Sequence, residues 1–188
     1  MQKWQCLSSY NKTDSLAITS RYGSLRSFMN TFNPKMQNRY CHDVSRCFFG
    51  TAPTLGQLQE AYGKDSAASW VIPQLYNLSE YCGAAGKLTK LQYIELSTII
   101  AAEFHYLKVT ELMLFFYRFK SGRYGHFYGS VDPLVITCSL QEFINERGCA
   151  IAQNEQEERE RRNIEEREGV ISYDEYLRRK AEKEGKRL

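Results

Sequence analysis

The chain has 188 residues, of which 43% are hydrophobic and 25% charged, with a formal net charge of +3. This length suits one domain with an appendage or two small domains, and the composition excludes a chain that is disordered throughout. No apolar stretch is long enough to span a bilayer, and no secretory signal follows the first residue. We therefore expect a cytoplasmic protein without a membrane partner, whose six cysteines are reduced rather than bridged.

The distribution of charge divides the chain into three regions. Residues 1–48 carry seven basic side chains against two acidic ones, and aromatic side chains lie among them. Residues 49–153 are almost neutral, whereas residues 154–188 mix ten basic with eleven acidic side chains and contain few apolar ones. We predict a basic N-terminal arm with one helix, a helical body and a charged helical tail over these three ranges.

Apolar periodicity predicts the helix of the arm. Apolar residues recur in steps of three and four from Ile18 to Phe32, which predicts a single helix over about 14–32. Asn33 stands before a proline and is therefore disfavoured in helical backbone geometry, so the helix is predicted to end there. Residues 35–53 show no such period and are predicted to be a connection.

Helix-capping signals predict the elements of the body. Thr54 and Thr89 are each followed by a glutamine three residues later, the capping-box pattern, which predicts helices over about 55–62 and 90–105. Another helix is predicted over about 66–81.

Two more helices are predicted further along the body. Thr110 is predicted to open one of them, with Phe116 in its buried phenylalanine face. The other begins at Pro133, because proline suits the first position of a helix. In the tail, Ser172 with Glu175 predicts a final helix. No strand pattern is convincing, so the predicted fold is all-α: a compact multi-helix domain with a long charged C-terminal helical tail.

The segment 118–133 is the strongest candidate site. Its glycines allow sharp turns or close approach of the backbone to a partner, and basic and aromatic side chains lie between them. One interpretation is a nucleic-acid surface that holds phosphates and stacks on bases. Its binding residues are then Arg118, Lys120, Arg123, Tyr124, His126 and Tyr128. The other interpretation, which we favour, is a rigid connection between helices whose aromatic side chains fill the core.

Metal and catalytic signatures are weak. Cys41, His42 and Cys47, with Cys6 further off, lack the paired spacing of a zinc site, so buried thiols are expected instead. No nucleophile with an adjacent base has a local signature. We therefore expect no metal, no cofactor and no enzymatic activity, and an enzyme with an unrecognised site ranks third among the functional interpretations.

Two longer stretches carry a resemblance to a known group of proteins. One runs from Pro53 through Trp70 to Glu80, and the other from Tyr106 through the phenylalanine run to Pro133. Over about residues 50–150 the chain resembles a family of uncharacterised proteins encoded in Bacteroidota genomes and in their phages and mobile elements. That resemblance implies no particular activity.

The layout of the chain also resembles that of phage helicase loaders, in which a small helical domain precedes a flexible tail that engages the replicative helicase. The leading hypothesis is therefore a non-enzymatic adaptor of a phage or mobile element that acts in DNA replication, with another protein such as a replicative helicase as partner. The alternative is a nucleic-acid-binding protein that uses the basic arm and the segment 118–133 on DNA or RNA. A homo-oligomer is open in both cases, as is a structural or virion-associated role.

Overall fold

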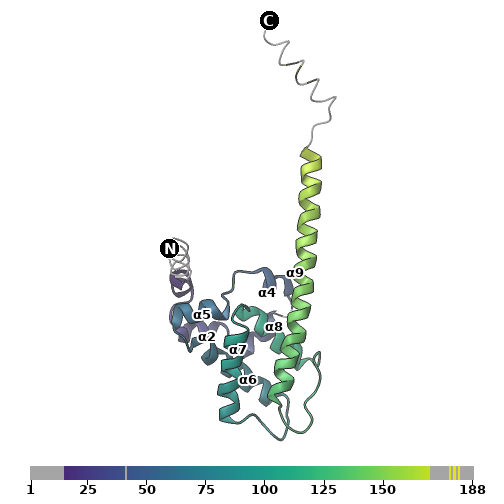
Figure 1. Cartoon of the computed structure of the whole chain (residues 1–188). Helices are drawn as coiled ribbons and strands as arrows, with labels where there is room; N and C mark the ends of the chain where they lie inside the picture. Colours follow the sequence, from purple (N-terminus) through teal and green to yellow (C-terminus); the bar gives the residue numbers. More distant parts are fainter. Residues whose placement is uncertain (1–14, 41, 170–177, 179, 181, 183–188) are drawn as a thin grey trace, which may run out of the picture. The chain divides into compact units, whose positions relative to one another are not determined.

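The computed structural model describes residues 15–40, 42–169, 178, 180 and 182. The regular elements of this described part are all helices, with isolated bridges in place of strands (Figure 1). The predicted all-α fold with a long charged C-terminal helix is thus confirmed. A helical segment over 15–22 comes first. It is followed by α2 (Leu25–Thr31), the 3-10 helix η1 (Pro34–Met36), α3 (Gln37–Tyr40), α4 (Val44–Phe49), α5 (Leu55–Tyr62), α6 (Ser66–Tyr81), α7 (Lys90–Glu103), α8 (Val109–Lys120) and α9 (Pro133–Gly169).

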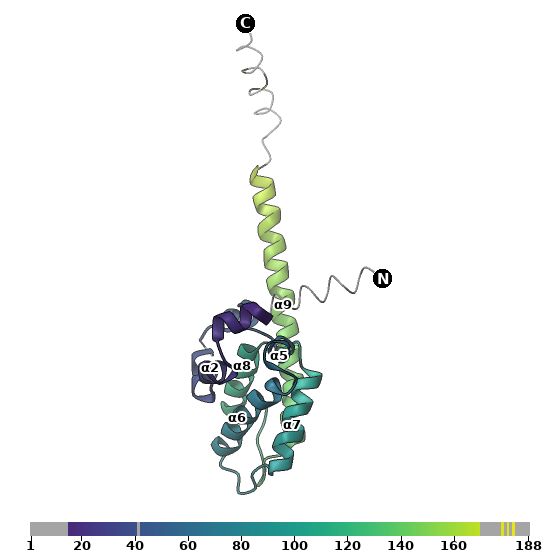
Figure 2. The ribbon, with the colours of Figure 1, turned by 90° about the vertical axis from the view of Figure 1, so that its left-hand side faces the viewer.

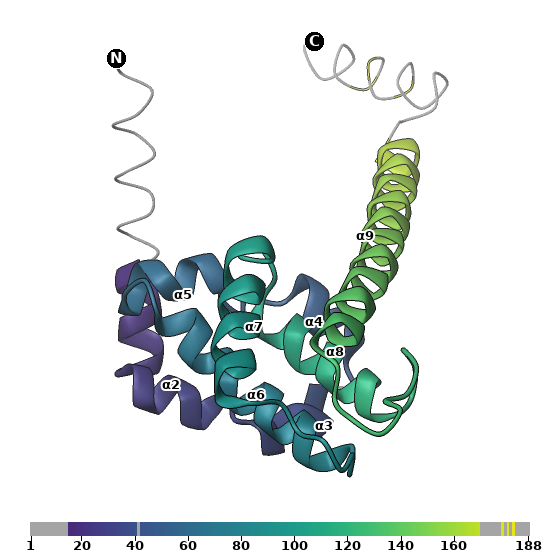
Figure 3. The same ribbon diagram turned by 60° about the horizontal axis from the view of Figure 1, so that its bottom comes forward.

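By their contacts, the residues form two compact units, Met1–Asn145 and Glu146–Leu188. In the first unit α6 packs along α7 and also contacts α5 and α8 (Figures 2 and 3). Helix α8 is contacted in addition by α3 and α4. The described residues of the predicted arm over 1–48 therefore contribute helices to the same compact unit as the body. The predicted boundaries after residues 48 and 153 stay predictions.

The predicted single helix over 14–32 is wrong, because the chain breaks at Gly23. This glycine has a φ of 71°, in the left-handed region that glycine adopts without a steric penalty. Ser24 then caps α2, its side-chain oxygen accepting a hydrogen bond from the backbone N–H of Ser27 at 3.3 Å. The apolar period continued through the break, so periodicity alone did not reveal it. The hydroxyl of Tyr62 donates to the Gly23 carbonyl at 2.9 Å and ties the turn to α5.

The predicted connection over 35–53 is also wrong, because it contains η1, α3 and α4. These helices are too short to show a hydrophobic period. Side chains set the starts of two of them: Asn33 accepts from the N–H of Lys35 at 3.0 Å before η1, and Asp43 accepts from the N–H of Arg46 at 2.8 Å before α4. The Cys47 side chain is fully buried, as expected for a small core residue.

The capping boxes at Thr54 and Thr89 are confirmed. Each threonine hydroxyl accepts the N–H of the glutamine three residues later at 3.2 Å, and each glutamine side chain accepts the threonine N–H. Helix α6 has the predicted bounds and continues through Pro73. The local signals of this part of the sequence were therefore sufficient to place three helices.

Helix α8 begins one residue earlier than predicted, and its start is held by Lys108 rather than by Thr110. The Lys108 ammonium donates to the carbonyls of Phe48 and Gly50 at 2.6 and 2.8 Å, while its backbone N–H donates to the Glu111 carboxylate at 2.7 Å. The Thr110 hydroxyl donates to the carbonyl of Cys47 at 3.1 Å and so does not cap the helix. These bonds fasten α8 to the end of α4.

The phenylalanine face of α8 forms the core, as predicted. Phe115 and Phe116 are fully buried, and their ring centroids lie 5.2 Å apart. Phe115 also packs against Phe143 of α9 at 5.7 Å, with the ring planes at 61° in an edge-to-face contact, a favourable arrangement for two aromatic quadrupoles. The first turns of α9 are therefore part of the same core as α8.

Helix α9 begins as predicted, with Pro133 as its first residue and Asp132 accepting the N–H of Leu134 at 2.8 Å. Further along, its polar side chains pair in steps of four: Gln153 donates to Glu157 at 3.0 Å and Gln156 to Glu160 at 2.9 Å. Such pairs support a solvated helix. The helix predicted from Ser172 and Glu175 lies outside the described residues.

One buried group on α6 yields a stability prediction. Ser79 is fully buried, and its hydroxyl has no hydrogen-bond partner among the described residues. Because an unpaired buried hydroxyl costs about 1–3 kcal/mol, Ser79→Ala is expected to raise the free energy of unfolding by about 1 kcal/mol. Urea denaturation of both proteins measures the change. A loss of stability would show that the hydroxyl has a partner, such as a bound water.

Candidate functional site

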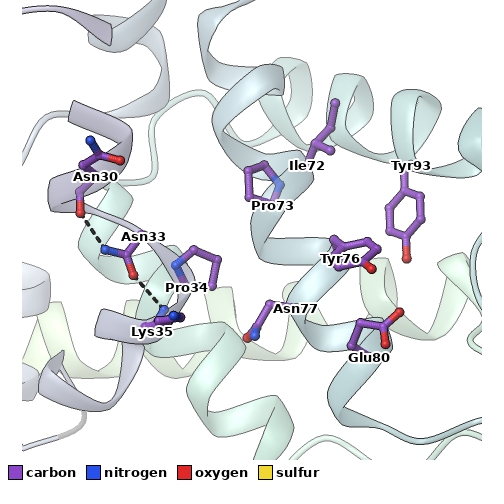
Figure 4. A pocket seen from close by; sticks show the side chains of 10 residues that line it. All are labelled: Asn30, Asn33, Pro34, Lys35, Ile72, Pro73, Tyr76, Asn77, Glu80 and Tyr93. Atoms are coloured by element: carbon purple, nitrogen blue, oxygen red, sulfur yellow. Dashed lines mark hydrogen bonds between the residues drawn. The ribbon is translucent and has the colours of Figure 1, made fainter. Parts of the chain in front are cut away.

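A hollow of about 600 Å³ opens between the segment 30–35 and α6 (Figure 4). Tyr93 of α7 borders it on the far side of α6 (Figure 4). Its lining comprises Asn30, Asn33, Pro34, Lys35, Ile72, Pro73, Tyr76, Asn77, Glu80 and Tyr93. Aromatic rings, proline rings and amides dominate this surface, while its acidic residue, Glu80, is paired with Lys87 at 2.6 Å.

The walls of this hollow are fixed by local contacts. Asn33 donates to the Asn30 carbonyl at 2.6 Å and accepts from the Lys35 N–H at 3.0 Å, so its amide holds the bend between α2 and η1. On the opposite wall the rings of Tyr76 and Tyr93 lie 6.1 Å apart. Tyr76 is 56% exposed, so its ring presents a face to solvent. The hollow is therefore largely formed before any partner binds.

Two further hollows continue along α6. The second, of about 360 Å³, shares Lys35 and Asn77 with the first. The third, of about 240 Å³, shares Tyr81 and Lys120 with the second and reaches His126 of the glycine-rich segment 118–133. We call the three hollows together the α6 groove. A series of hollows that share residues suits a long ligand better than a compact one.

Asn77 and Lys120 form a polar pair inside the groove. The Lys120 ammonium donates to Asn77 Oδ1 at 2.7 Å and lies 5.6 Å from the centre of the Tyr81 ring. Burial lowers the pKa of Lys120, and the neighbouring Cys82 opposes that shift. An ammonium group only donates hydrogen bonds, so Asn77 must turn its oxygen toward Lys120 and its amide nitrogen away from it.

Gln37 lies beneath the second hollow and is only 1% exposed. Its Nε2 donates to Gln74 Oε1 at 2.6 Å, and Gln74 Nε2 donates in turn to the Phe32 carbonyl at 2.9 Å. The same carbonyl accepts from the Trp70 indole at 2.9 Å. This chain of bonds fixes the orientation of Gln37 and leaves its Oε1 without a partner in the described part of the chain.

Among the predicted nucleic-acid-binding residues, Tyr124 lies in the core. It is 8% exposed, and its ring stacks on that of Phe115 with the centroids 5.6 Å apart. Its carbonyl accepts from the Ser139 hydroxyl at 3.3 Å. A ring held in this way has no free face for a base, which argues against the stacking role and agrees with the connector interpretation of Tyr124.

The other predicted residues occupy two settings. Arg118 and Lys120, on the last turn of α8, lie against the rings of Phe143 and Tyr81 at 5.9 and 5.6 Å. Arg123, His126 and Tyr128 are exposed, and Tyr128 reaches 91%. The structure therefore gathers three exposed side chains on the segment 118–133 and assigns Lys120 to the α6 groove.

Sequence reasoning missed the α6 groove. Its walls come from 30–37 and 72–81, which lie about 40 positions apart and carry no shared motif. The available signal was the surplus of tyrosines on α6 and α7, because Tyr76 and Tyr81 stand outside the buried face of their helix. Such residues identify a candidate surface but not the element that faces it.

The core position of Tyr124 yields a prediction. Tyr124→Ala is expected to lower the free energy of unfolding by about 2–4 kcal/mol, since it removes a buried aromatic ring. Tyr128→Ala is the matched control and is expected to change stability by less than about 0.5 kcal/mol. Chemical denaturation checks both. Equal effects of the two substitutions would place the Tyr124 ring outside the core.

Within the described residues, no group of three or more histidine, cysteine or acidic side chains is arranged to hold a metal ion. Cys6 and Cys41 lie outside those residues. Of the described helices, none is both long enough and apolar enough to cross a membrane.

Comparison with known proteins bears on identity rather than on activity. No curated protein and no solved structure matches the chain. Residues 87–187 match a family described as "Family of unknown function (DUF6633)". The matched span contains α7, α8, the glycine-rich segment and α9, and covers more than half of the chain. The chain therefore belongs to this family of unknown function, DUF6633.

Proposed function

We propose that the chain is a non-enzymatic adaptor that binds an extended segment of a partner protein in the α6 groove. The observation that carries this proposal is the series of three hollows along α6, which share lining residues from one to the next. Extended peptides dock in grooves of this kind, where aromatic rings receive side chains and fixed polar groups meet the peptide backbone.

The composition of the groove supports a peptide as the ligand. Tyr76, Tyr81 and Tyr93 supply broad apolar faces with hydroxyl groups at their rims, and Pro34 and Pro73 add rigid apolar surface. Tyrosine offers a large contact area and loses little side-chain entropy on binding. These residues suit the apolar side chains of a flexible segment that becomes ordered on binding.

The proposed setting is a phage or mobile-element process such as DNA replication, with a replicative helicase as the partner to test first. Support comes from the arrangement of the chain, a small helical unit followed by a long charged helix, which resembles that of phage helicase loaders. Capture of the proteins that bind the chain identifies the partner.

Affinity capture tests the adaptor proposal. The tagged full chain and its Tyr76→Ala variant are expressed in the organism that encodes them, and the proteins that co-purify are quantified by mass spectrometry. We expect one partner to be depleted about tenfold by Tyr76→Ala, as for a central interface aromatic. The control Tyr128→Ala removes a ring that does not line the groove and is expected to retain the partner. Capture that is insensitive to Tyr76→Ala would exclude the groove as the binding site.

A second candidate function is nucleic-acid binding by Arg123, His126 and Tyr128, and the exposure of the Tyr128 ring favours it. If these residues contact nucleic acid, Arg123→Ala is expected to weaken binding and to flatten its dependence on salt. Titration of a labelled single-stranded oligonucleotide at several salt concentrations measures this. Absence of binding by the unmodified chain at low salt would exclude this function.

A further inference from the structure

Lys120 is a partly buried cation that two hollows of the α6 groove share. It lines the second and the third hollow, and among the described residues neither lining contains an acidic side chain. Its ammonium donates to Asn77 Oδ1 at 2.7 Å and lies 5.6 Å from the centre of the Tyr81 ring. Because Asn77 and Tyr81 themselves line the second hollow, these contacts place the ammonium at the wall of that hollow.

Comparison with Lys108 shows what Lys120 lacks. Both ammonium groups make part-buried hydrogen bonds, but that of Lys108 donates to two carbonyls, whereas the described residues offer Lys120 one acceptor. An ammonium group has three N–H donors, so that of Lys120 keeps two for water or for a ligand. Burial also lowers the pKa of Lys120, because the charged form has lost part of its water. A ligand that brings a negative charge would compensate for that loss.

The second hollow has a lysine at each of its two junctions with the neighbouring hollows. Lys35 is shared with the first hollow and Lys120 with the third. Lys35 is exposed, so water weakens any ion pair made there. Lys120 has already lost part of its water on folding, and a charge pair is stronger in less polar surroundings. A negative charge on a bound segment therefore gains most at the junction of the second and third hollows.

We propose that Lys120 is the carboxylate-binding position of the α6 groove. An aspartate or glutamate side chain of the partner's extended segment accepts hydrogen bonds from the Lys120 ammonium, while an apolar side chain of the same segment occupies the tyrosine-lined first hollow. This inference rests on the proposed adaptor function and names the chemistry of the segment that is recognised. The segment combines an apolar residue with an acidic residue a few positions away.

Peptide selection followed by an amide scan tests this position. Random dodecapeptides displayed on phage are selected on the immobilised full chain, with the Tyr76→Ala chain as counter-selection. Each aspartate or glutamate of the best binder is then replaced by asparagine or glutamine, which keeps the shape of the side chain and removes its charge. Affinities are measured for the unmodified chain, for Lys120→Met and for the matched control Lys64→Met, which removes the same charge at an exposed position that does not line the groove.

We expect one acidic position at which the amide weakens binding to the unmodified chain about tenfold, as for a close charge pair with a partly buried member. The same replacement is expected to have no further effect on binding to Lys120→Met, and its full effect on binding to Lys64→Met. The amide scan of the unmodified chain does not depend on how well Lys120→Met folds.

Three results would overturn the carboxylate-binding position: no enriched peptide, no acidic residue of the best binder whose amide weakens binding, or equal sensitivity to the amide in the unmodified chain and in Lys120→Met. Binding of an oligonucleotide that Lys120→Met abolishes, with no peptide enriched, would also overturn it, since phosphate would then be the anion. If capture of a cellular partner still depended on Tyr76, the adaptor function would stand and only the role of Lys120 would be wrong.

Discussion

Phe116→Ala is expected to lower the free energy of unfolding by about 3–5 kcal/mol, the range for truncating a large aromatic residue in a packed core. Phe116 is fully buried on α8, the helix that α3, α4 and α6 all contact. Because the ring is fully enclosed, its removal leaves a cavity in the interior. Denaturation in guanidinium chloride, followed by circular dichroism, measures the loss.

Phe49→Ala is the matched control for this prediction. Phe49 ends α4 and is 42% exposed, so the same truncation removes a ring that is partly in water already. Its expected cost is about 1 kcal/mol. A cost for Phe116→Ala no greater than that for Phe49→Ala would mean that the phenylalanine face of α8 is not the centre of the core.

Lys108→Met is expected to lower the free energy of unfolding by about 2–4 kcal/mol. The ammonium donates to the carbonyls of Phe48 and Gly50, and hydrogen bonds to charged groups are worth about 1.5–3 kcal/mol each. Methionine keeps most of the aliphatic length and offers no donor, so both partly buried carbonyls lose their partner. Thermal and urea denaturation of the variant give the magnitude.

Lys64→Met is the matched control. It removes the same positive charge at an exposed position between α5 and α6. It is expected to change stability by less than about 0.5 kcal/mol. If Lys108→Met were equally silent, the end of α4 would be held by other contacts, and the bonds from Lys108 would contribute little.

The sequence predicted those helices that begin next to a residue with a strong preference for a helix start. The bounds of α5 and the starts of α7 and α9 follow from capping residues and a proline within a few positions of each helix end, whereas Asp65 before α6 makes no capping hydrogen bond. The break at Gly23 and the short helix α4 were not predictable in this way. Periodicity is unchanged by one glycine in a left-handed conformation, and a helix of six residues is too short to show a period.

The candidate site was predicted less well, for a different physical reason. The segment 118–133 was predicted as a candidate binding site because its glycine, basic and aromatic residues are neighbours in sequence. The structure instead buries one of them, Tyr124, in the core. The α6 groove depends on contacts between residues remote in sequence, such as the bond from Gln37 to Gln74. Tertiary packing decides which aromatic rings are covered, and a single sequence carries little information about it.

Site-specific photo-crosslinking tests the proposed binding groove most directly. Benzoylphenylalanine replaces Tyr76 in one version of the full chain and Tyr128 in another, and each is irradiated in cells of the organism that encodes it. The adaptor proposal predicts a protein crosslink from position 76 and none to the same protein from position 128. A crosslink to nucleic acid from position 128, with no protein captured at position 76, would contradict it.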